Sequence, residues 1–328
     1  MRGQVTDSQY VEPAILNHTD RAMMAMKYMI TQDVLGVKKT IDISENDFSN
    51  IRTAYATLQN VISSEEQFDA VARNFFDLES DLLATTLEFT YIAVGDGIKN
   101  MAARRLLNRR LLNFLSSARG YMDHQRHAVK EVFGDNDPRS DQAVRIFRVQ
   151  HSENFGYRLM EELRNACQHR IFPVHAIVFH VQNEREKDAL HSKVEIHVNI
   201  DELRADKKFK KTVLEELMVH GKTVDLRPFI RTYIEGIAKA HRYFRENVNE
   251  KSGKAASVLQ NHIDLYRDAH CGSSMLSLHA IQVVEDVWIE RVPLSTGLPE
   301  YHAYLARQNL HFETTSVKYV SSSAFNQD

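Results

Sequence analysis

The chain has 328 residues, of which 43% are hydrophobic and 26% are charged, with only 12 Gly and 6 Pro. This composition is typical of a globular, helix-rich protein with ample core, and it excludes a low-complexity or collagen-like chain. The formal net charge of −3 gives no global attraction to nucleic acid, so any RNA site must be a local patch.

The cysteine count and the hydropathy pattern indicate where the protein works. Two cysteines, Cys167 and Cys271, favour a reducing compartment and argue against a disulfide scaffold. No apolar run reaches the roughly 20 residues of a membrane span, and charged residues interrupt the stretch 14–31. We therefore expect a cytoplasmic protein without a membrane partner.

The first 45 residues form a predicted N-terminal segment. Four methionines gather in it, at Met23, Met24, Met26 and Met29. Methionine side chains fill irregular apolar gaps, so the segment is either a short helix that packs on the rest of the protein or a segment that contacts a partner.

Helical periodicity becomes clear from Asp47. The first predicted helix has an apolar face that consists of Phe48, Ile51, Tyr55, Leu58 and Ile62. The run 64–67, Ser-Glu-Glu-Gln, has the pattern of a capping box and predicts the start of a second helix. That helix continues to Phe89 before the Gly-Asp-Gly sequence at 95–97 breaks it. The short link predicts that the two helices are antiparallel neighbours.

A third helix is predicted over residues 98–133. Its core stripe consists of Leu107, Leu111, Phe114, Ala118 and Tyr121, and its candidate RNA-binding residues are Arg104, Arg105, Arg109, Arg110 and Arg119. If this helix packs beside the one that follows, these arginines can track an RNA backbone. The alternative is an ordinary solvated helix face. Turn residues at 134–138 close the helix, and Ser140 to Gln150 leads into the next one.

The predicted helix from Phe155 to about residue 172 carries the most informative grouping. Its apolar stripe consists of Phe155, Leu159, Leu163, Ala166 and Cys167. On the opposite side, an arc of roughly 140° holds Arg164, Gln168, Asn165 and His169. Pro173 ends the helix, so His169 is expected near a helix C-terminus, where the macrodipole favours an imidazolium.

This combination of side chains suits RNA cleavage without a metal ion or other cofactor. An arginine can hold a phosphate and stabilise charge that builds on its oxygens. A histidine can take a proton from a 2′-hydroxyl or give one to the leaving oxygen, and RNA supplies that hydroxyl. Asn165 can bind phosphate or orient the histidine.

The sequence Arg164-Asn165-Ala166-Cys167-Gln168-His169 resembles the Arg, four to six residues, His motif of the HEPN superfamily. The resemblance implies an all-helical bundle that dimerises, with paired motifs forming a metal-independent RNA-cleaving site. It also implies a toxin of a toxin-antitoxin system or an effector of antiviral defence, and an inhibitory protein partner. Arg164 and His169 would be catalytic, with Asn165 in support. Some members continue with x-Tyr after the His, whereas Arg170 and Ile171 follow here.

Similar Arg-to-His spacings also occur elsewhere in the chain, for example from Arg119 to His124. The context of Arg164 distinguishes it, because Asn165 follows and an amphipathic helix leads in. The alternative is a solvated helix end with charged residues.

Beyond Pro173 the period changes from helical to alternating. Residues 174–181 and 193–200 predict a β-hairpin with a long charged loop at 183–191. The hairpin carries four histidines, His175, His180, His191 and His197. They lack the ligand spacing of a zinc site, so we expect no bound metal.

The remainder of the chain mixes helices and strands. A basic helix around 207–211 is expected to end at Gly221, and further helices are expected from Asp225, over 257–268 and from Pro299. The β-rich stretch 276–294 could join the hairpin in one antiparallel sheet.

The sequence predicts a mainly α (α+β) protein: an N-terminal segment at 1–45, a HEPN-like helical bundle at 46–172, an α+β C-terminal region at 173–315 and a disordered tail at 316–328. In this interpretation the chain is a metal-independent endoribonuclease that acts as a homodimer on RNA. One alternative is a non-catalytic helical scaffold that binds a nucleotide, RNA or protein. Another is that the motif is accidental and the function lies in the C-terminal half.

Overall fold

The computed structural model describes residues 26–34, 39–92, 96–168, 172–184, 189–270 and 277–320, and these fall into two compact units. The sheet unit comprises the described residues up to Tyr55 and from Ser257 to Thr296. The helical unit comprises Ala56–Ala256 and the described residues from Gly297 onward. Helices α1 (Glu45–Tyr91) and α7 (Arg227–Ala269) contribute to both units.

The expected mainly α (α+β) fold is confirmed, with eight α-helices and two small antiparallel sheets among the described residues. The remaining helices are α2 (Gly97–Phe133), α3 (Pro138–Glu153), α4 (Phe155–Cys167), α5 (Ile200–Ala205), α6 (Lys211–Met218) and α8 (Gly297–Gln308). A 3-10 turn follows at Phe312–Val317. In the part of the chain that is described, no helix is both long and apolar enough to span a bilayer.

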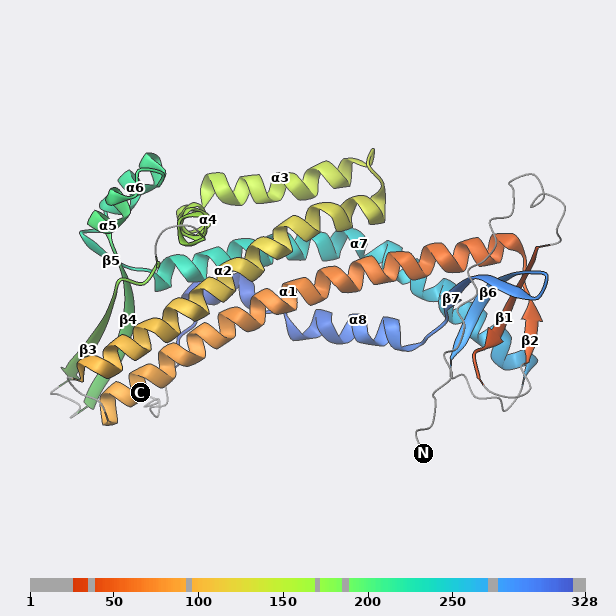
Figure 1. The fold of residues 1–328 in the computed structure, drawn as a ribbon, viewed down its shortest axis with the longest axis horizontal. Helices are drawn as coiled ribbons and strands as arrows, with labels where there is room; N and C mark the ends of the chain where they lie inside the picture. The colour runs from red at the N-terminus through yellow and green to blue at the C-terminus, as the bar shows by residue number, and fades with distance from the viewer. Residues whose placement is uncertain are drawn as a thin grey trace, which may run out of the picture. The chain divides into compact units, whose positions relative to one another are not determined.

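The sheet unit is built on a four-stranded antiparallel sheet. Its strands are β1 (Lys27–Gln32), β2 (Thr40–Asp42), β6 (Leu278–Val284) and β7 (Val287–Pro293), in the order β2-β1-β6-β7 (Figure 1). Strands β6 and β7 are joined by Glu285 and Asp286, which both have positive φ, as a two-residue hairpin turn of type I′ requires. Ile30 of β1 pairs with Ala280 of β6 and both are buried.

Two expectations for these segments are wrong. The β-rich stretch 276–294 joins β1 and β2, not the hairpin at 174–200, so the strands form two sheets. Met29 lies in strand β1 rather than in a helix, because β1 is paired on one edge by β2 and on the other by the distant strand β6. Met23 and Met24 lie outside the described residues.

Helix α1 is continuous for 47 residues, so the helix start predicted at 64–67 is also wrong. The Ser64 hydroxyl donates back to the Asn60 carbonyl oxygen at 3.2 Å, within the helix. Ser64 and Glu65 are both fully buried, so tertiary contacts decide this position rather than the local capping signal. Helix α7 likewise runs through Ser257, where a separate helix was expected.

The core of the helical unit confirms the predicted stripe of α2, since Leu107, Leu111, Phe114, Ala118 and Tyr121 are all fully buried. The predicted hairpin is confirmed as β3 (Ala176–Glu184) and β4 (Ala189–Asn199), and β5 (Thr223–Asp225) adds a third strand in the order β3-β4-β5. The pairing of β3 with β4 continues to Glu184 and Ala189, so the loop between them is shorter than predicted.

The basic helix expected around 207–211 begins later than predicted. Helix α6 starts at Lys211, so most of the basic run precedes it, and Gly221, which follows the helix, adopts φ +121°.

The predicted disordered tail begins at Ser316, but the backbone N–H of Ser316 donates to Glu235 Oε1 at 2.6 Å. Residues 321–328 of the predicted tail lie outside the described residues.

Candidate functional site

Helix α4 carries the candidate motif, and its first turn is attached to α7. Asn154 caps the helix by accepting from the backbone N–H of Tyr157 at 3.1 Å. The same side chain donates through Nδ2 to the carbonyl oxygen of Thr232 at 2.8 Å. One residue therefore both starts α4 and fixes its position on α7.

Gly156 allows α4 and α7 to approach closely. A Cβ atom at this position would lie 2.1 Å from Thr232 Oγ1 and 2.8 Å from the carbonyl oxygen of Phe229. No side chain fits at these distances, so glycine sets the spacing of the two helices. The remaining faces of α4 pack against α2, α3 and α6.

The predicted apolar stripe of α4 is confirmed, with Leu159, Leu163 and Ala166 fully buried. The side of α4 that lies opposite this stripe is polar, as expected, but its residues differ in their exposure to solvent. Arg164 is half-buried, whereas Asn165 and Gln168 are exposed. The motif arginine therefore lies at the boundary between core and solvent.

The guanidinium of Arg164 does not use all of its hydrogen-bond donors within the described structure. Its Nη1 donates to Asn165 Oδ1 at 3.1 Å. Its Nε is shielded from solvent and has no hydrogen-bond partner, and the guanidinium makes no ion pair within the described ranges. A buried donor without a partner is costly, so this position favours a further hydrogen-bond acceptor beyond those of the described residues.

A second arginine lies close to the same place. The Tyr233 hydroxyl of α7 donates to Glu161 Oε1 at 2.6 Å, and Arg119 Nη1 of α2 lies 3.6 Å from Glu161 Oε2. Burial raises the Tyr233 pKa well above 10, and the nearby positive charge of Arg164 opposes this rise. Arg164 thus acts on Tyr233, and Arg119 approaches the Glu161 carboxylate that accepts from the same tyrosine.

The other half of the motif, His169, lies outside the described residues, so its distance from Arg164 remains a prediction. Helix α4 ends at Cys167, earlier than the expected end near residue 172. Gln168 is the last described residue before the gap, and its backbone N–H donates to the Arg164 carbonyl oxygen at 3.2 Å. His169 therefore follows the last helical residue by two positions.

The five candidate RNA-binding arginines of α2 lie in different environments. Arg104 Nη1 donates to the His175 carbonyl oxygen at 3.0 Å, and Arg105 and Arg109 are exposed. Their proposed contact with RNA stays a prediction.

Arg110 and Arg119 are bound by carboxylates. Arg110 contacts Asp77 at 2.9 Å and Asp81 at 2.6 Å, both on α1. Arg119 contacts Asp123 at 2.8 Å in addition to Glu161. A phosphate would have to compete with these carboxylates, so Arg105 and Arg109 are the more accessible pair.

Sequence reasoning missed a buried polar network in the helical unit. Glu65 of α1 accepts from Arg245 Nε and Nη2 at 2.8 and 2.5 Å and lies 3.1 Å from His241 Nε2, both on α7. His241 Nδ1 lies 3.0 Å from the Tyr121 hydroxyl, and the imidazole stacks on Phe68 at 4.0 Å. The network joins α1, α2 and α7.

The protonation states of this network follow from burial. Burial alone would raise the Glu65 pKa, but hydrogen bonds from Arg245 and His241 lower it to about 2. Burial lowers the His241 pKa, so at neutral pH the ring is uncharged. Tyr121 then donates to Nδ1, and Nε2 donates to Glu65. Because Glu65 and His241 are enclosed, the network is structural.

One sequence signal could have revealed it. Glu65 stands three residues before Phe68 and four after Val61, which places a carboxylate on the apolar face of α1. A charged residue in such a position requires a partner, and Arg245 supplies it.

Two of the four hairpin histidines, His180 and His197, contact a second carboxylate, that of Glu195. Glu195 Oε2 lies 2.9 Å from both His180 Nε2 and His197 Nε2, while Oε1 lies 2.7 Å from Lys193 Nζ and 3.1 Å from Arg227 Nη2. Burial would raise the Glu195 pKa, but these donors lower it to about 2. Within the described ranges, no three His, Cys, Asp or Glu side chains are arranged to hold a metal ion.

Comparison with known proteins adds no relative. A scan of protein-family models, a search of curated proteins and a search of solved structures each gave no match. The resemblance to the HEPN superfamily therefore rests on residues 164–169 and their helical setting.

Proposed function

We propose that the protein is a metal-independent endoribonuclease of HEPN type, with Arg164 as the phosphate-binding group and His169 as the proton carrier. Asn165 supports the reaction by orienting the guanidinium, to which it is hydrogen-bonded. The observation that carries the proposal is the state of Arg164. It is a half-buried guanidinium with an unpartnered Nε and no ion pair among the described residues.

The proposed reaction is an internal transfer within the RNA. The 2′-oxygen attacks the adjacent phosphorus as its proton passes to a base, and the bond from phosphorus to the 5′-oxygen breaks. The leaving oxygen takes a proton, and the products carry a 2′,3′-cyclic phosphate and a 5′-hydroxyl. His169 exchanges these protons, and Arg164 stabilises the charge on the phosphoryl oxygens. No metal ion is needed because the nucleophile belongs to the substrate.

The proposal includes a homodimer. The polar arc of α4 is convex, with Asn165 and Gln168 exposed. A convex surface becomes a cleft only when another surface closes over it, and a second copy would supply a second motif. Arg105 and Arg109, which are exposed on α2, would contact the RNA backbone beyond the cut.

We further propose that the protein works in the cytoplasm as a toxin or a defence effector, and that an inhibitory protein blocks its activity. The two cysteines fit a reducing compartment. This part of the proposal follows from the HEPN resemblance and depends on the activity being found.

The activity is tested with purified protein and total RNA in EDTA. We expect cleavage by the wild type, a loss of about 10²–10⁴-fold in His169→Ala and about 10²–10³-fold in Arg164→Ala. His127→Ala on α2 and Arg148→Ala on α3, which remove the same groups from exposed positions, should retain full activity. DNA of the same sequence should stay intact.

Circular dichroism should show that all four variants keep the fold. Full activity in His169→Ala would remove this residue from the mechanism. RNA binding without cleavage by the wild type would favour the non-catalytic scaffold instead.

A further inference from the structure

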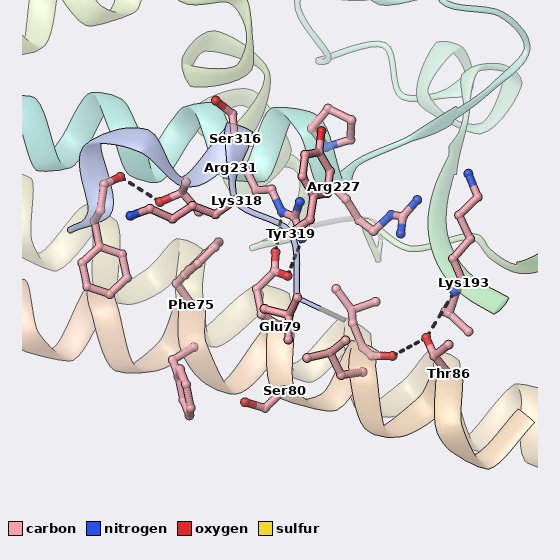
Figure 2. Close-up of a pocket in the computed structure, with 18 of the residues that line it drawn as sticks. Phe75, Glu79, Ser80, Thr86, Lys193, Arg227, Arg231, Ser316, Lys318 and Tyr319 are labelled. Carbon is pink, nitrogen blue, oxygen red and sulfur yellow. Dashed lines mark hydrogen bonds and ion pairs between the residues drawn. The ribbon is translucent and has the colours of Figure 1, made fainter. Parts of the chain in front are cut away.

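A second candidate site lies in the helical unit, apart from the motif. It is a groove of about 820 Å³ between the second half of α1, strand β4, the start of α7 and the segment from Gln308 to Val320 (Figure 2). Neither Arg164 nor Asn165 lines it. Its volume falls in the range of sites for small organic ligands.

The α1 wall of the groove is apolar and incompletely covered. Phe75 and Leu82 are buried, but their neighbours Phe76 and Leu83 are 58% and 43% exposed. Phe76 and Leu83 stand seven residues apart, so they share one face of the helix. A ligand that covered Phe76 and Leu83 would remove their apolar surface from water, and this burial would favour binding.

The rest of the lining is largely polar, and its basic residues outnumber its acidic ones. Four basic residues line the groove against two acidic ones, an excess of two positive charges with His311 counted as neutral: Lys193, Arg227, Arg231 and Lys318 against Glu79 and Asp225. Figure 2 shows Arg231 beside Glu79, and the two form a bidentate pair at 2.9 and 2.7 Å. Arg227 is bound by Asp225 at 2.9 Å. The Glu195 carboxylate, which does not line the groove, lies 3.1 Å from Arg227 and 2.7 Å from Lys193 and offsets one of the two excess charges.

The two lysines differ in their partners. Lys193 Nζ contacts Glu195, whereas Lys318 Nζ contacts only the carbonyl oxygen of His311 and meets no carboxylate among the described residues. Lys318 is therefore the ammonium most available to an anion. A further polar group is the buried Oγ of Ser192 in the β4 wall, which has no hydrogen-bond partner among the described residues.

We propose that this groove binds a small organic anion with a flat or chain-like apolar body. The body lies on Phe76 and Leu83, and the acidic group faces Lys318. A neutral ligand would leave the charge excess unmatched, and a cation would be repelled by it. A fully polar anion such as inorganic phosphate would leave the apolar wall uncovered. The inference is independent of the proposed ribonuclease activity because none of the described motif residues lines the groove.

The test uses 8-anilinonaphthalene-1-sulfonate as an anionic probe and its parent without the sulfonate, N-phenyl-1-naphthylamine, as a neutral one. Both are titrated into the full chain and followed by fluorescence. We expect the anion to bind at least about tenfold more tightly than the neutral probe, with an affinity that falls as salt is added.

Matched variants place the probe in the groove. Leu83→Ser should weaken binding of the anion roughly tenfold, whereas Leu87→Ser should not, although Leu87 lies one turn further along α1 and is 55% exposed. Lys318→Gln should weaken it severalfold, and Lys254→Gln on the exposed part of α7 should leave it unchanged. Thermal unfolding of each variant checks that the fold is kept.

Two results would overturn the inference. One is equal binding of the anionic and neutral probes, which would remove the role of Lys318. The other is an equal effect of Leu83→Ser and Leu87→Ser, which would place the probe on the exposed apolar surface in general.

Discussion

Replacing Glu65 by Gln removes the charge at the centre of the buried network while keeping the shape of the side chain. Lowering a carboxyl pKa from 4.5 to about 2 corresponds to about 3 kcal/mol of folding stability at neutral pH. Hydrogen bonds from Arg245 and His241 and the electrostatic interactions of Glu65 with both side chains supply this stabilisation. We expect Glu65→Gln to lower the free energy of unfolding at pH 7 by about 2–3 kcal/mol.

The pH dependence gives the sign of the effect. Because the folded pKa of Glu65 lies below its unfolded value, its stabilisation is fully present above pH 4.5 and is lost as the pH falls to about 2. Urea unfolding of both proteins at several pH values between 7 and 2 therefore measures it. The difference between wild type and Glu65→Gln should shrink across this range.

Glu66→Gln is the matched control, since Glu66 is exposed and, within the described part of the chain, accepts a hydrogen bond only from the Tyr301 hydroxyl, at 3.0 Å. It should change stability by less than about 0.5 kcal/mol. Equal effects of the two substitutions at pH 7, or a difference that persists at pH 2, would refute the reasoning.

Three further predictions concern the helix that carries the motif. Asn154→Ala should lower the free energy of unfolding by about 1–2 kcal/mol in urea titrations, because it removes the cap of α4 and the bond to Thr232; no change would mean that the cap does not anchor α4. Gly156→Ala should cost about 1–3 kcal/mol, measured in the same way, since its Cβ would overlap Thr232 Oγ1; wild-type stability would contradict the close approach of α4 and α7. Burial raises the Cys167 pKa to about 12, so in a Cys271→Ser background this thiol should react with Ellman's reagent at pH 8 far more slowly when folded than in urea; equal rates would refute its burial.

Helix faces could be predicted from the sequence because they depend on local periodicity. The stripe of α2 and the buried face of α4 follow from apolar residues three and four apart. The exposure of Asn165 and Gln168 follows from the same wheel, whereas Arg164, expected to face outward with them, is half-buried. The candidate site was located by this simple geometry.

Features that depend on distant partners could not be predicted in this way. The pairing of Ile30 with Ala280 joins segments about 250 residues apart, which no local pattern reveals. The helix start expected at Ser64 was wrong for the same reason, because burial against α7 outweighs the capping signal. The acidic partner of Arg110 at Asp77 likewise depends on how α1 and α2 pack.

The central claim is that Arg164 and His169 cut RNA through its own 2′-hydroxyl. The most direct measurement uses a synthetic RNA with one cleavage position, incubated in EDTA, and mass spectrometry of the product ends. We predict a 2′,3′-cyclic phosphate on one product and a 5′-hydroxyl on the other, and no cleavage when that nucleotide is replaced by its 2′-deoxy form. Products with 5′-phosphate ends, or cutting at the 2′-deoxy position, would contradict the account.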